Sequence, residues 1–488
     1  MPILRIVASS CGSLLSLALA MLLGACETSD GSPELALIYN ASASYHAPDR
    51  NPIIAVPGLL GSKLRDKQTD ILVWGAFDSS SADPDNPDHL RLISLPIGDG
   101  VAPLAQLRDD VEPTGVLDKA RISLLGIPFE LEVYAGILAT LGIGGYRDQA
   151  LGLAGEVDYG SDHFTCFQFA YDWRRDIVES ARLLHQFILK KRDFVRAQYM
   201  DRYGVADPEV KFDIVTHSMG GLVTRYFLMY GSQDLPADGS LPELTWEGAE
   251  FVERVIFVGT PNAGSVLAFD NLINGKDLGP FLPIYPPALL GTFPSTYQLL
   301  PRSRHRLVVW DGELDRPIED LLDPALWERL KWGLAAPNQG DMVSAMIPDV
   351  SDAAERRRRA VALQAQILQR TNSFMAAMDR PATPPAGLEL FSIIGDGFET
   401  PKHASVDSRT GAVRILDTDE GDGTVLRASA LLDERLGGEW QPQVVTPLQS
   451  HRVLFLPSEH IDLTKSQTFR DNVLFWLLED PRITPEES

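Results

Sequence analysis

The stretch 211–225, KFDIVTHSMGGLVTR, constrains the fold of this chain more than any other. Its first half is rich in β-branched and aromatic side chains and too short for a helix, which indicates a buried strand over residues 209–215. An apolar run with helical spacing follows Ser218 at once, past Gly220 and Gly221. This pattern is typical of a nucleophile elbow, in which a serine sits on a strained strand-to-helix turn. A plain strand–turn–helix connection is the alternative.

The alternation of strands and helices along the chain predicts an α/β fold with a mostly parallel central sheet flanked by helices. The chain has 488 residues, of which 44% are hydrophobic and 23% are charged, as in ordinary globular proteins. Its formal net charge of −24 argues against nucleic acid as a partner, because the two would repel. We expect one core with an insertion rather than several modules.

Short apolar runs and apolar residues at helical spacing indicate where the strands and helices of this core lie. Short runs predict strands at 52–56, 164–169, 254–258, 388–394 and 453–456. Helical spacing predicts helices at 130–141, 177–203, 352–379 and 466–478. The Asp-, Ser- and Pro-rich residues 76–96 are expected to form a loop.

The first residues have the pattern of an export signal. Arg5 precedes an apolar run at 14–23, which is too short to span a bilayer but suits a secretory signal. The run ends in Leu-Gly-Ala before Cys26, which resembles a bacterial lipoprotein signal peptide (residues 1–25) with Cys26 as the lipidated residue. The resemblance implies an exported, membrane-anchored protein, and Glu27 favours the outer membrane. An ordinary signal or an uncleaved anchor is the alternative.

Residues 26–50 are expected to form a tether behind that anchor. Of the three cysteines, only Cys166 would then remain unmodified in the folded part, so no internal disulfide is expected. Cys166 lies in an apolar strand pattern, and we interpret it as a core residue rather than a nucleophile.

A serine nucleophile needs a base and a carboxylate that orients the base. His460 follows the last predicted strand, where a side chain can reach over the end of the sheet. The other histidines after Ser218 lie before that strand or near the insertion. In the acidic loop at 417–425, Asp422 is favoured as the acid because glycines on both sides allow a sharp turn. A calcium loop is the weaker alternative, because its ligand spacing is not met. We expect no metal and no cofactor.

Two backbone amides are the expected donors to a bound oxyanion. The amide that follows the nucleophile belongs to Met219, and the second donor is expected at Leu59, in the glycine-containing loop after the first strand.

Five blocks occur in an order that resembles the lecithin:cholesterol acyltransferase and lysosomal phospholipase A2 family, over about 51–478. These blocks are Val-Pro-Gly at 56–58, Tyr-Asp-Trp-Arg at 171–174, His-Ser-Met-Gly at 217–220, Gly-Asp-Gly-Thr-Val at 421–425 and Glu-His at 459–460. Thr216 and Gly423 depart from the pattern of the family, where a small residue and a second Asp are usual. The disulfides of its mammalian members cannot form here.

The resemblance implies an α/β-hydrolase fold and a Ser-Asp-His enzyme acting on acyl esters of lipids, such as phospholipids or acylglycerols. Ser218, Asp422 and His460 match the catalytic positions, and Leu59 and Met219 match the oxyanion donors. Tyr171, Asp172 and Trp173 are assigned to substrate binding. The acyl group would pass to water or to a lipid alcohol. A non-catalytic lipoprotein that uses the fold as a binding scaffold is the alternative.

The distance in sequence between Ser218 and Asp422 predicts an insertion, because two or three strand–helix units need only about 100 residues. We therefore expect the core at 51–268 and 387–488, with a cap at 269–386 that covers the active site. Its apolar segment 269–292 is expected to act as a lid; a static cap packed into the core is the alternative.

Overall fold

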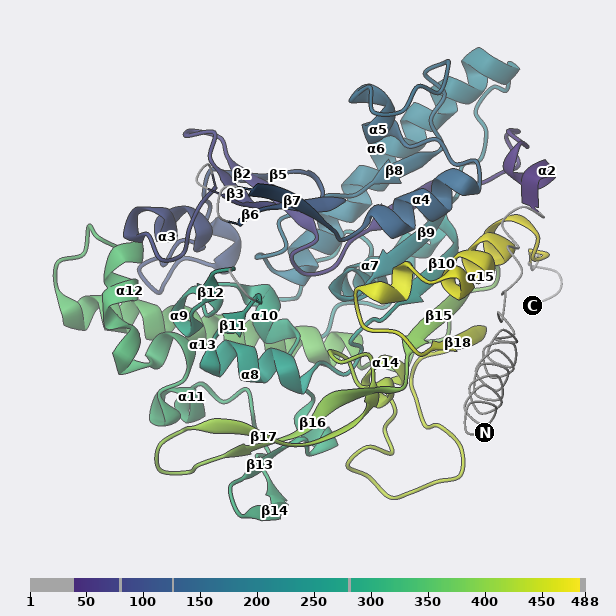
Figure 1. The fold of residues 1–488 in the computed structure, drawn as a ribbon. Helices are drawn as coiled ribbons and strands as arrows, with labels where there is room; N and C mark the ends of the chain where they lie inside the picture. Colours follow the sequence, from purple (N-terminus) through teal and green to yellow (C-terminus); the bar gives the residue numbers. More distant parts are fainter. Residues whose placement is uncertain (1–38, 79–80, 125–126, 280–281, 483–488) are drawn as a thin grey trace, which may run out of the picture.

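A six-stranded parallel sheet forms the centre of the molecule (Figure 1). The computed structural model describes residues 39–78, 81–124, 127–279 and 282–482. In the order β18-β15-β10-β9-β1-β8, the strands are Arg452–Leu456, Glu389–Gly395, Val252–Val258, Phe212–His217, Ile53–Val56 and Cys166–Gln168. All five neighbouring pairs are parallel. The predicted sheet is confirmed, and the protein has an α/β-hydrolase fold.

Helices cover both faces of this sheet, because its inner strands are apolar on both sides. Val215 and Ile256 pack on one face with side chains of α4 (Ala135–Ile143) and α15 (Gln467–Leu478). Ile214 and Val255 pack on the other face with side chains of α6 (Ile177–Tyr203) and α7 (Met219–Tyr230). This two-sided burial explains why the strands have nearly continuous apolar sequences.

The remaining α-helices of the described residues lie mostly in the connections between these elements. They are α2 (Asn40–Ala43), α3 (Pro87–Ile93), α5 (Gln149–Leu153), α8 (Val266–Asn274), α9 (Pro287–Leu290), α10 (Pro294–Gln298), α11 (Pro324–Leu330), α12 (Gly340–Met346), α13 (Ala353–Met378) and α14 (Arg427–Leu431). None of the helices in the described ranges combines the length and apolar character needed to cross a membrane.

Within the described residues, four smaller sheets lie outside the central sheet. One contains β2 (Ser62–Asp66), β3 (Leu72–Trp74) and β5 (Val111–Val116), and another contains β4 (Ala76–Phe77), β6 (Lys119–Leu124) and β7 (Ile127–Glu132). A third pairs β11 (Lys276–Asp277) with β12 (Ile284–Tyr285). The fourth has the order β14-β13-β16-β17, with β13 at Val308–Trp310, β14 at Glu313–Pro317, β16 at Phe398–Val406 and β17 at Val413–Gly421.

A predicted helix and a predicted loop are wrong, because strand pairing and a helix-capping signal determine the structure at these places. The helix expected at 130–141 is divided: residues up to Glu132 belong to β7, which pairs with β6, and α4 starts at Ala135. The loop expected at 76–96 contains β4 and α3. A Pro stands at the start of α3, and the Asn86 side chain caps it by accepting from the Asp88 amide, which is a standard helix start.

The acidic stretch before Asp422 is also not a loop, because residues up to Gly421 form strand β17 against β16. Lys402 and His403 of β16 pair across the strands with Asp419 and Asp417. The ion pair of Lys402 and the hydrogen bond of His403 offset part of the repulsion among the carboxylates, so a strand is possible despite the charge.

The apolar segment of the predicted insertion is buried at its two ends. Phe269, Leu272, Tyr285 and Leu289 are at most 2% exposed and pack in the same core as α6 and α7, whereas Ile284 is 57% exposed. The two ends of this segment therefore pack as the static alternative requires, whereas its described middle, at 273–279 and 282–284, contains no buried residue. Whether it also opens as a lid stays a prediction.

The predicted signal 1–25 and Cys26 lie outside the described residues. The tether was expected to reach residue 50, but residues 39–50 contact the folded body. Tyr39 packs on Leu474 of α15, and the Arg50 guanidinium lies 4.2 Å from the centre of the Tyr146 ring. An aromatic ring and a cation–π contact thus hold this end of the segment in place.

One buried arginine fastens the last helix to the sheet. Arg254 of β10 is 1% exposed, and its Nε lies 2.6 Å from a carboxylate oxygen of Glu389 in β15. Its guanidinium also donates to the carbonyl oxygens of Trp476, Asp480 and Pro481.

We predict that Arg254→Met lowers the free energy of unfolding by about 3–5 kcal/mol, because Glu389 would remain buried without its partner. Urea denaturation would measure this change. Arg358→Met is the control, because Arg358 and Glu355 pair on the surface, where solvent screens the interaction, and we expect its loss to change the stability little. Equal losses in the two variants would contradict the prediction.

Candidate active site

Ser218 lies on a strained turn between β9 and α7. Its backbone has φ 54° and ψ −129°, a region that residues other than glycine rarely adopt. The Ser218 amide donates to the Val258 carbonyl at 2.8 Å, and its carbonyl accepts from the Gly221 amide at 2.9 Å. These two bonds hold the backbone in place at the carboxyl end of the sheet.

The glycines around this turn allow neighbouring backbones to approach. A Cβ at Gly220 would lie 2.3 Å from the Pro57 carbonyl oxygen, and one at Gly221 would lie 2.0 Å from Oγ1 of Thr260. A Cβ at Gly220 would also lie 2.8 Å from Oγ1 of Thr216. Thr216 therefore fits where a small residue is usual, because the residue opposite it lacks a side chain.

The structure brings Ser218, His460 and Asp422 together. Nε2 of His460 lies 2.9 Å from Oγ of Ser218, and Nδ1 lies 2.7 Å from Oδ2 of Asp422. The His460 amide also donates to the Asp422 carbonyl at 2.9 Å. His460 is 9% exposed and Asp422 is 2% exposed. This arrangement allows the imidazole to take a proton from the serine while the carboxylate fixes its orientation.

The surroundings of Asp422 favour its ionised form. Burial alone would raise the pKa of this carboxyl, but the nearby His460 and its hydrogen bond lower it. The amides of Val425 and Thr424 donate to Oδ1 at 2.7 and 3.0 Å and lower it further. The net pKa of Asp422 is below its ordinary value, so it is a carboxylate at neutral pH.

The other histidines after Ser218 have partners elsewhere. Nδ1 of His451 accepts from the Leu390 amide at the opposite end of the sheet. His305 lies 3.2 Å from Glu434, and His403 lies 2.8 Å from Asp417. Of these four histidines, only His460 contacts Ser218 in the part of the chain that the structure describes.

The loop that contains Leu59 passes directly over Ser218. A Cβ at Gly58 would lie 2.7 Å from Cβ of Ser218 and 3.2 Å from its Oγ. Among the hydrogen bonds between described residues, neither the Leu59 amide nor the Met219 amide is a donor. Both remain available to a bound ligand, as an oxyanion site requires.

Tyr171, Asp172 and Trp173, predicted to bind substrate, are buried, and Tyr171 and Trp173 support this loop. The Tyr171 hydroxyl donates to the Pro57 carbonyl at 2.8 Å, and Nε1 of Trp173 donates to the Ser62 carbonyl at 3.2 Å. Asp172 is paired with the fully buried Arg174. The structure thus gives them a supporting position, and direct contact with a substrate stays a prediction.

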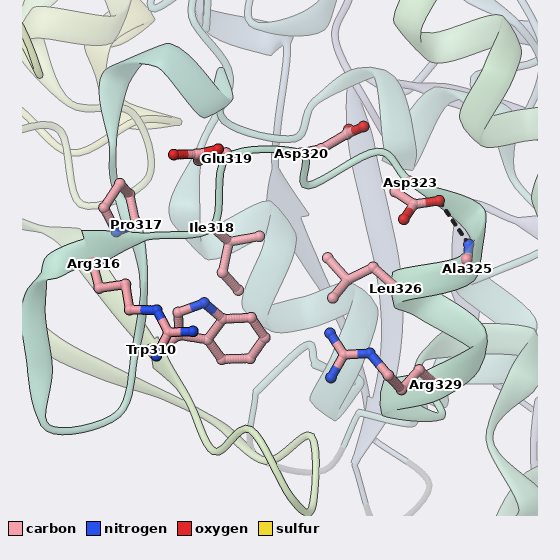
Figure 2. Close-up of a pocket in the computed structure, with 10 residues that line it drawn as sticks. All are labelled: Trp310, Arg316, Pro317, Ile318, Glu319, Asp320, Asp323, Ala325, Leu326 and Arg329. Carbon is pink, nitrogen blue, oxygen red and sulfur yellow. Dashed lines mark hydrogen bonds between the residues drawn. The ribbon is translucent and has the colours of Figure 1, made fainter.

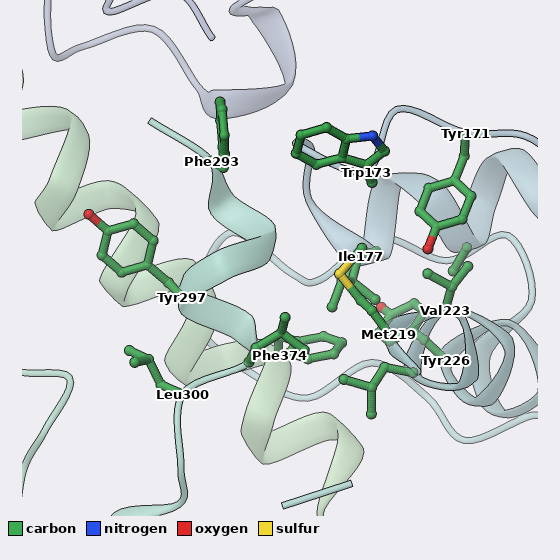
Figure 3. Close-up of a cluster of buried hydrophobic side chains, with 14 of the residues drawn as sticks. Tyr171, Trp173, Ile177, Met219, Val223, Tyr226, Phe293, Tyr297, Leu300 and Phe374 are labelled. Atoms are coloured by element: carbon green, nitrogen blue, oxygen red, sulfur yellow. The ribbon is translucent and has the colours of Figure 1, made fainter. Parts of the chain in front are cut away.

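The side chain of Met219 belongs to an apolar cluster that reaches the insertion. Figure 3 shows it close to Ile177, with Trp173 and Phe293 above it. Tyr297 of α10 and Phe374 of α13 complete this part of the cluster. The residue after the nucleophile is therefore packed against the same core as the predicted cap.

A separate pocket of about 510 Å³ lies between β13, β14 and α11 (Figure 2). Trp310, Ile318 and Leu326 lie among its lining residues, and none of the predicted site residues does. We find no group of three His, Cys, Asp or Glu side chains in the described ranges that could hold a metal ion.

Cys166 has the surroundings of a core residue. It is 1% exposed, and burial raises the pKa of its thiol well above the ordinary value, followed by the effect of Asp148. Its Sγ lies 3.3 Å from Oδ2 of Asp148. A protonated thiol is a poor nucleophile, as expected for a structural cysteine.

Tyr134 is a site residue that sequence reasoning missed. Its hydroxyl accepts from the Gly58 amide at 2.7 Å and lies 3.0 Å from Nδ1 of His217. No local signal marks this role, because Tyr134 lies more than 70 residues from both partners and within a wrongly predicted helix. In the sequence, His217 stands out only as part of the block His-Ser-Met-Gly.

We predict that Gly395→Ala slows the reaction of Ser218 with a fluorophosphonate on the order of 100-fold, because small misplacements of catalytic groups are costly. A Cβ at Gly395 would lie 2.3 Å from Cβ of Asp422, so the carboxylate would move away from His460. Gly142→Ala is the control, because no atom lies within 4 Å of the added Cβ. Equal labelling rates would contradict the prediction.

Comparisons with known proteins identify a family for part of the chain. Residues 155–323 match the sequence model of the lecithin:cholesterol acyltransferase family. This segment includes Ser218 and Tyr171 to Trp173 but neither Asp422 nor His460. Among curated proteins, no relative matches.

Several solved structures are similar over most of the chain. The Tle4-Tli4 complex is 16% identical over 88% of this chain and 98% of that chain, with a TM-score of 0.49. EstA from Clostridium botulinum is 12% identical over 89% and 88%, with a TM-score of 0.33. Lipase 1 from Pelosinus fermentans is 11% identical over 88% and 99%, with a TM-score of 0.35.

The family model and the five sequence blocks point to the same family. The predicted resemblance is therefore confirmed for residues 155–323, which carry the sequence signature of the lecithin:cholesterol acyltransferase family on an α/β-hydrolase fold.

Proposed function

We propose that this protein is a serine enzyme acting on acyl esters of lipids, as an O-acyltransferase, a lipase or a phospholipase. The observation that carries the proposal is the continuous hydrogen-bond line from Asp422 through His460 to Ser218, with distances of 2.7 and 2.9 Å. The family match over residues 155–323 supports the substrate class.

In the first half of the reaction, Oγ of Ser218 attacks the ester carbonyl while Nε2 of His460 takes its proton. The carbonyl oxygen becomes an oxyanion, which the amides of Leu59 and Met219 stabilise. When the oxyanion collapses, the ester bond breaks, and the departing alcohol takes the proton from His460. The acyl group is then bound to Ser218.

In the second half, water or a lipid alcohol attacks the acyl-enzyme. His460 takes the proton of the attacking hydroxyl, and Asp422 stabilises the imidazolium that forms. Collapse releases a fatty acid or a new ester, and the proton returns to Oγ of Ser218. A hydrolase and an acyltransferase share all of these residues and differ in the molecule that accepts the acyl group.

We further propose that a lipidated Cys26 anchors the protein to a membrane, with the outer membrane of the exporting cell as its destination. The signal pattern before Cys26 supports this. An anchored enzyme would meet lipid esters at the membrane surface.

The alternative, a non-catalytic lipoprotein that uses the fold as a binding scaffold, makes a different prediction for the serine. Such a protein has no need of a hydroxyl that is hydrogen-bonded to a buried imidazole on a strained turn. Strained backbone is usually retained where function requires it.

A product analysis tests the function and names the acceptor. The protein is incubated with phospholipid or acylglycerol vesicles, with and without an added lipid alcohol. We expect free fatty acid without the alcohol, and new ester with it if the enzyme is a transferase. Ser218→Ala should abolish both products and keep the fold, because the residual rate without the nucleophile is orders of magnitude lower. Product formation by this variant would exclude Ser218.

A second prediction concerns the acid. Asp422→Asn should lower kcat about 10³- to 10⁴-fold, because the amide cannot hold the imidazole in its working tautomer. Asp417→Asn is the control, because Asp417 pairs with His403 on the strand surface and is not bonded to His460. Steady-state kinetics with a short ester would compare them. A larger loss in Asp417→Asn would contradict the choice of Asp422.

A further inference from the structure

The buried imidazole of His217 lies between the catalytic groups without touching the reacting atoms. His217 is the last residue of β9 and is 1% exposed. Its Nδ1 lies 3.0 Å from the hydroxyl of Tyr134, and its Nε2 lies 3.0 Å from the backbone carbonyl oxygen of His460. Its ring centre lies 4.7 Å from that of His460.

The partners of His217 determine where its proton lies. The hydroxyl of Tyr134 accepts from the Gly58 amide at 2.7 Å and has one hydrogen to donate. If it donates to Nδ1 of His217, the proton of His217 is on Nε2 and donates to the carbonyl of His460. The other neutral tautomer would place an unprotonated Nε2 against that carbonyl, so two acceptors would face each other. Only the first assignment satisfies every group.

This chain of hydrogen bonds joins the three segments that carry the proposed reaction. It starts at Gly58, beside the oxyanion donor Leu59, passes through His217, beside the nucleophile, and ends at the backbone of His460. We propose that Tyr134 and His217 are positioning residues. They hold the loop of His460 in a fixed position relative to the loop of Gly58 and Leu59. This inference rests on the proposed function of Ser218 and His460.

This chain of hydrogen bonds holds the backbone of His460 at its carbonyl, in addition to the bond at its amide. The His460 amide donates to the Asp422 carbonyl at 2.9 Å, and the His460 carbonyl accepts from His217 at 3.0 Å. Without the second bond, the imidazole of His460 would keep its partner Asp422 but lose the constraint that aims Nε2 at Ser218. Catalysis would be slowed through orientation, with substrate binding unchanged.

His217 is suited to this role because it stays neutral. Burial, followed by the neighbouring His460, lowers the pKa of His217 to about 3. A second cation next to the imidazolium that forms on His460 would oppose the proton transfer. A neutral imidazole supplies one donor and one acceptor and adds no charge.

Three variants test the proposal: Tyr134→Phe, which removes only the hydroxyl; His217→Phe, which removes both links; and the double variant. We expect kcat for a short soluble ester to fall on the order of 10-fold in Tyr134→Phe and 10- to 100-fold in His217→Phe, with KM unchanged. The double variant should lose no more than His217→Phe alone, because both act through one chain of bonds.

Two further variants separate positioning from general damage. His217→Gln can place an amide N–H where Nε2 lies, so it should recover part of the kcat lost in His217→Phe. Tyr230→Phe is the matched control, because it removes a buried hydroxyl that donates to the Ala377 carbonyl at 2.8 Å, at the far end of α7. Its kcat should equal that of the wild type. Urea denaturation checks that each variant is folded at the assay temperature.

The rate of labelling by a fluorophosphonate distinguishes failure of the proposed function from failure of the positioning role. If the wild-type protein is not labelled at Ser218, the proposed function and the positioning role are both overturned. If the wild type is labelled and folded Tyr134→Phe is labelled equally fast, only the positioning role is overturned. The positioning role would also be overturned if the losses of kcat in the two single variants multiply in the double variant, or if His217→Gln recovers none of the kcat lost in His217→Phe. Should His217→Phe not fold, Tyr134→Phe and His217→Gln decide the question by themselves.

Discussion

The strained backbone of Ser218 is the constraint on which the site depends. A residue with φ 54° and ψ −129° costs on the order of 1–3 kcal/mol, and it persists only where its surroundings fix it. Here the surroundings are backbone segments at distances that only glycine permits: Gly58 against Ser218 itself, and Gly220 against Pro57. The loop of Leu59, the predicted oxyanion donor, and the elbow are therefore one packed unit, and the position of either one depends on the other.

The acid reaches this unit from a different sheet. Asp422 follows β17, which pairs with β16, and β16 pairs with β13 of the insertion. The small sheet thus joins the predicted cap to the carboxylate that orients His460. At the other end, α10 and α13 contribute Tyr297 and Phe374 to the apolar cluster around Met219 (Figure 3). The insertion is consequently part of the support of the site and more than a cover over it.

Much of the fold could be predicted from the sequence, because a parallel sheet covered on both faces needs continuous apolar strands. The strands β1, β9, β10, β15 and β18 were predicted from their apolar runs, and the full length of α6 was predicted from its helical spacing. Asp422 was singled out among four carboxylates by its flanking glycines, and it lies 2.7 Å from His460. In contrast, β17 was missed because its sequence is highly charged, and its stability depends on cross-strand partners such as Lys402, 17 residues away.

The roles that the sequence did not predict depend on contacts between residues that are distant in sequence. Nothing local marks Tyr134, whose hydroxyl matters only because Gly58 and His217 meet there. Tyr171 and Trp173 were identified by a motif, but their support of the loop at Pro57 and Ser62 depends on the packing of β1 beside β8.

The existence of an acyl-enzyme on Ser218 decides whether this account is correct. Rapid acid quenching during turnover of an activated ester, followed by peptide mass mapping, measures it. The account predicts a burst of alcohol release stoichiometric with the protein and an added acyl mass on the peptide containing Ser218. Turnover without a burst, or an acyl mass on another residue, would contradict it.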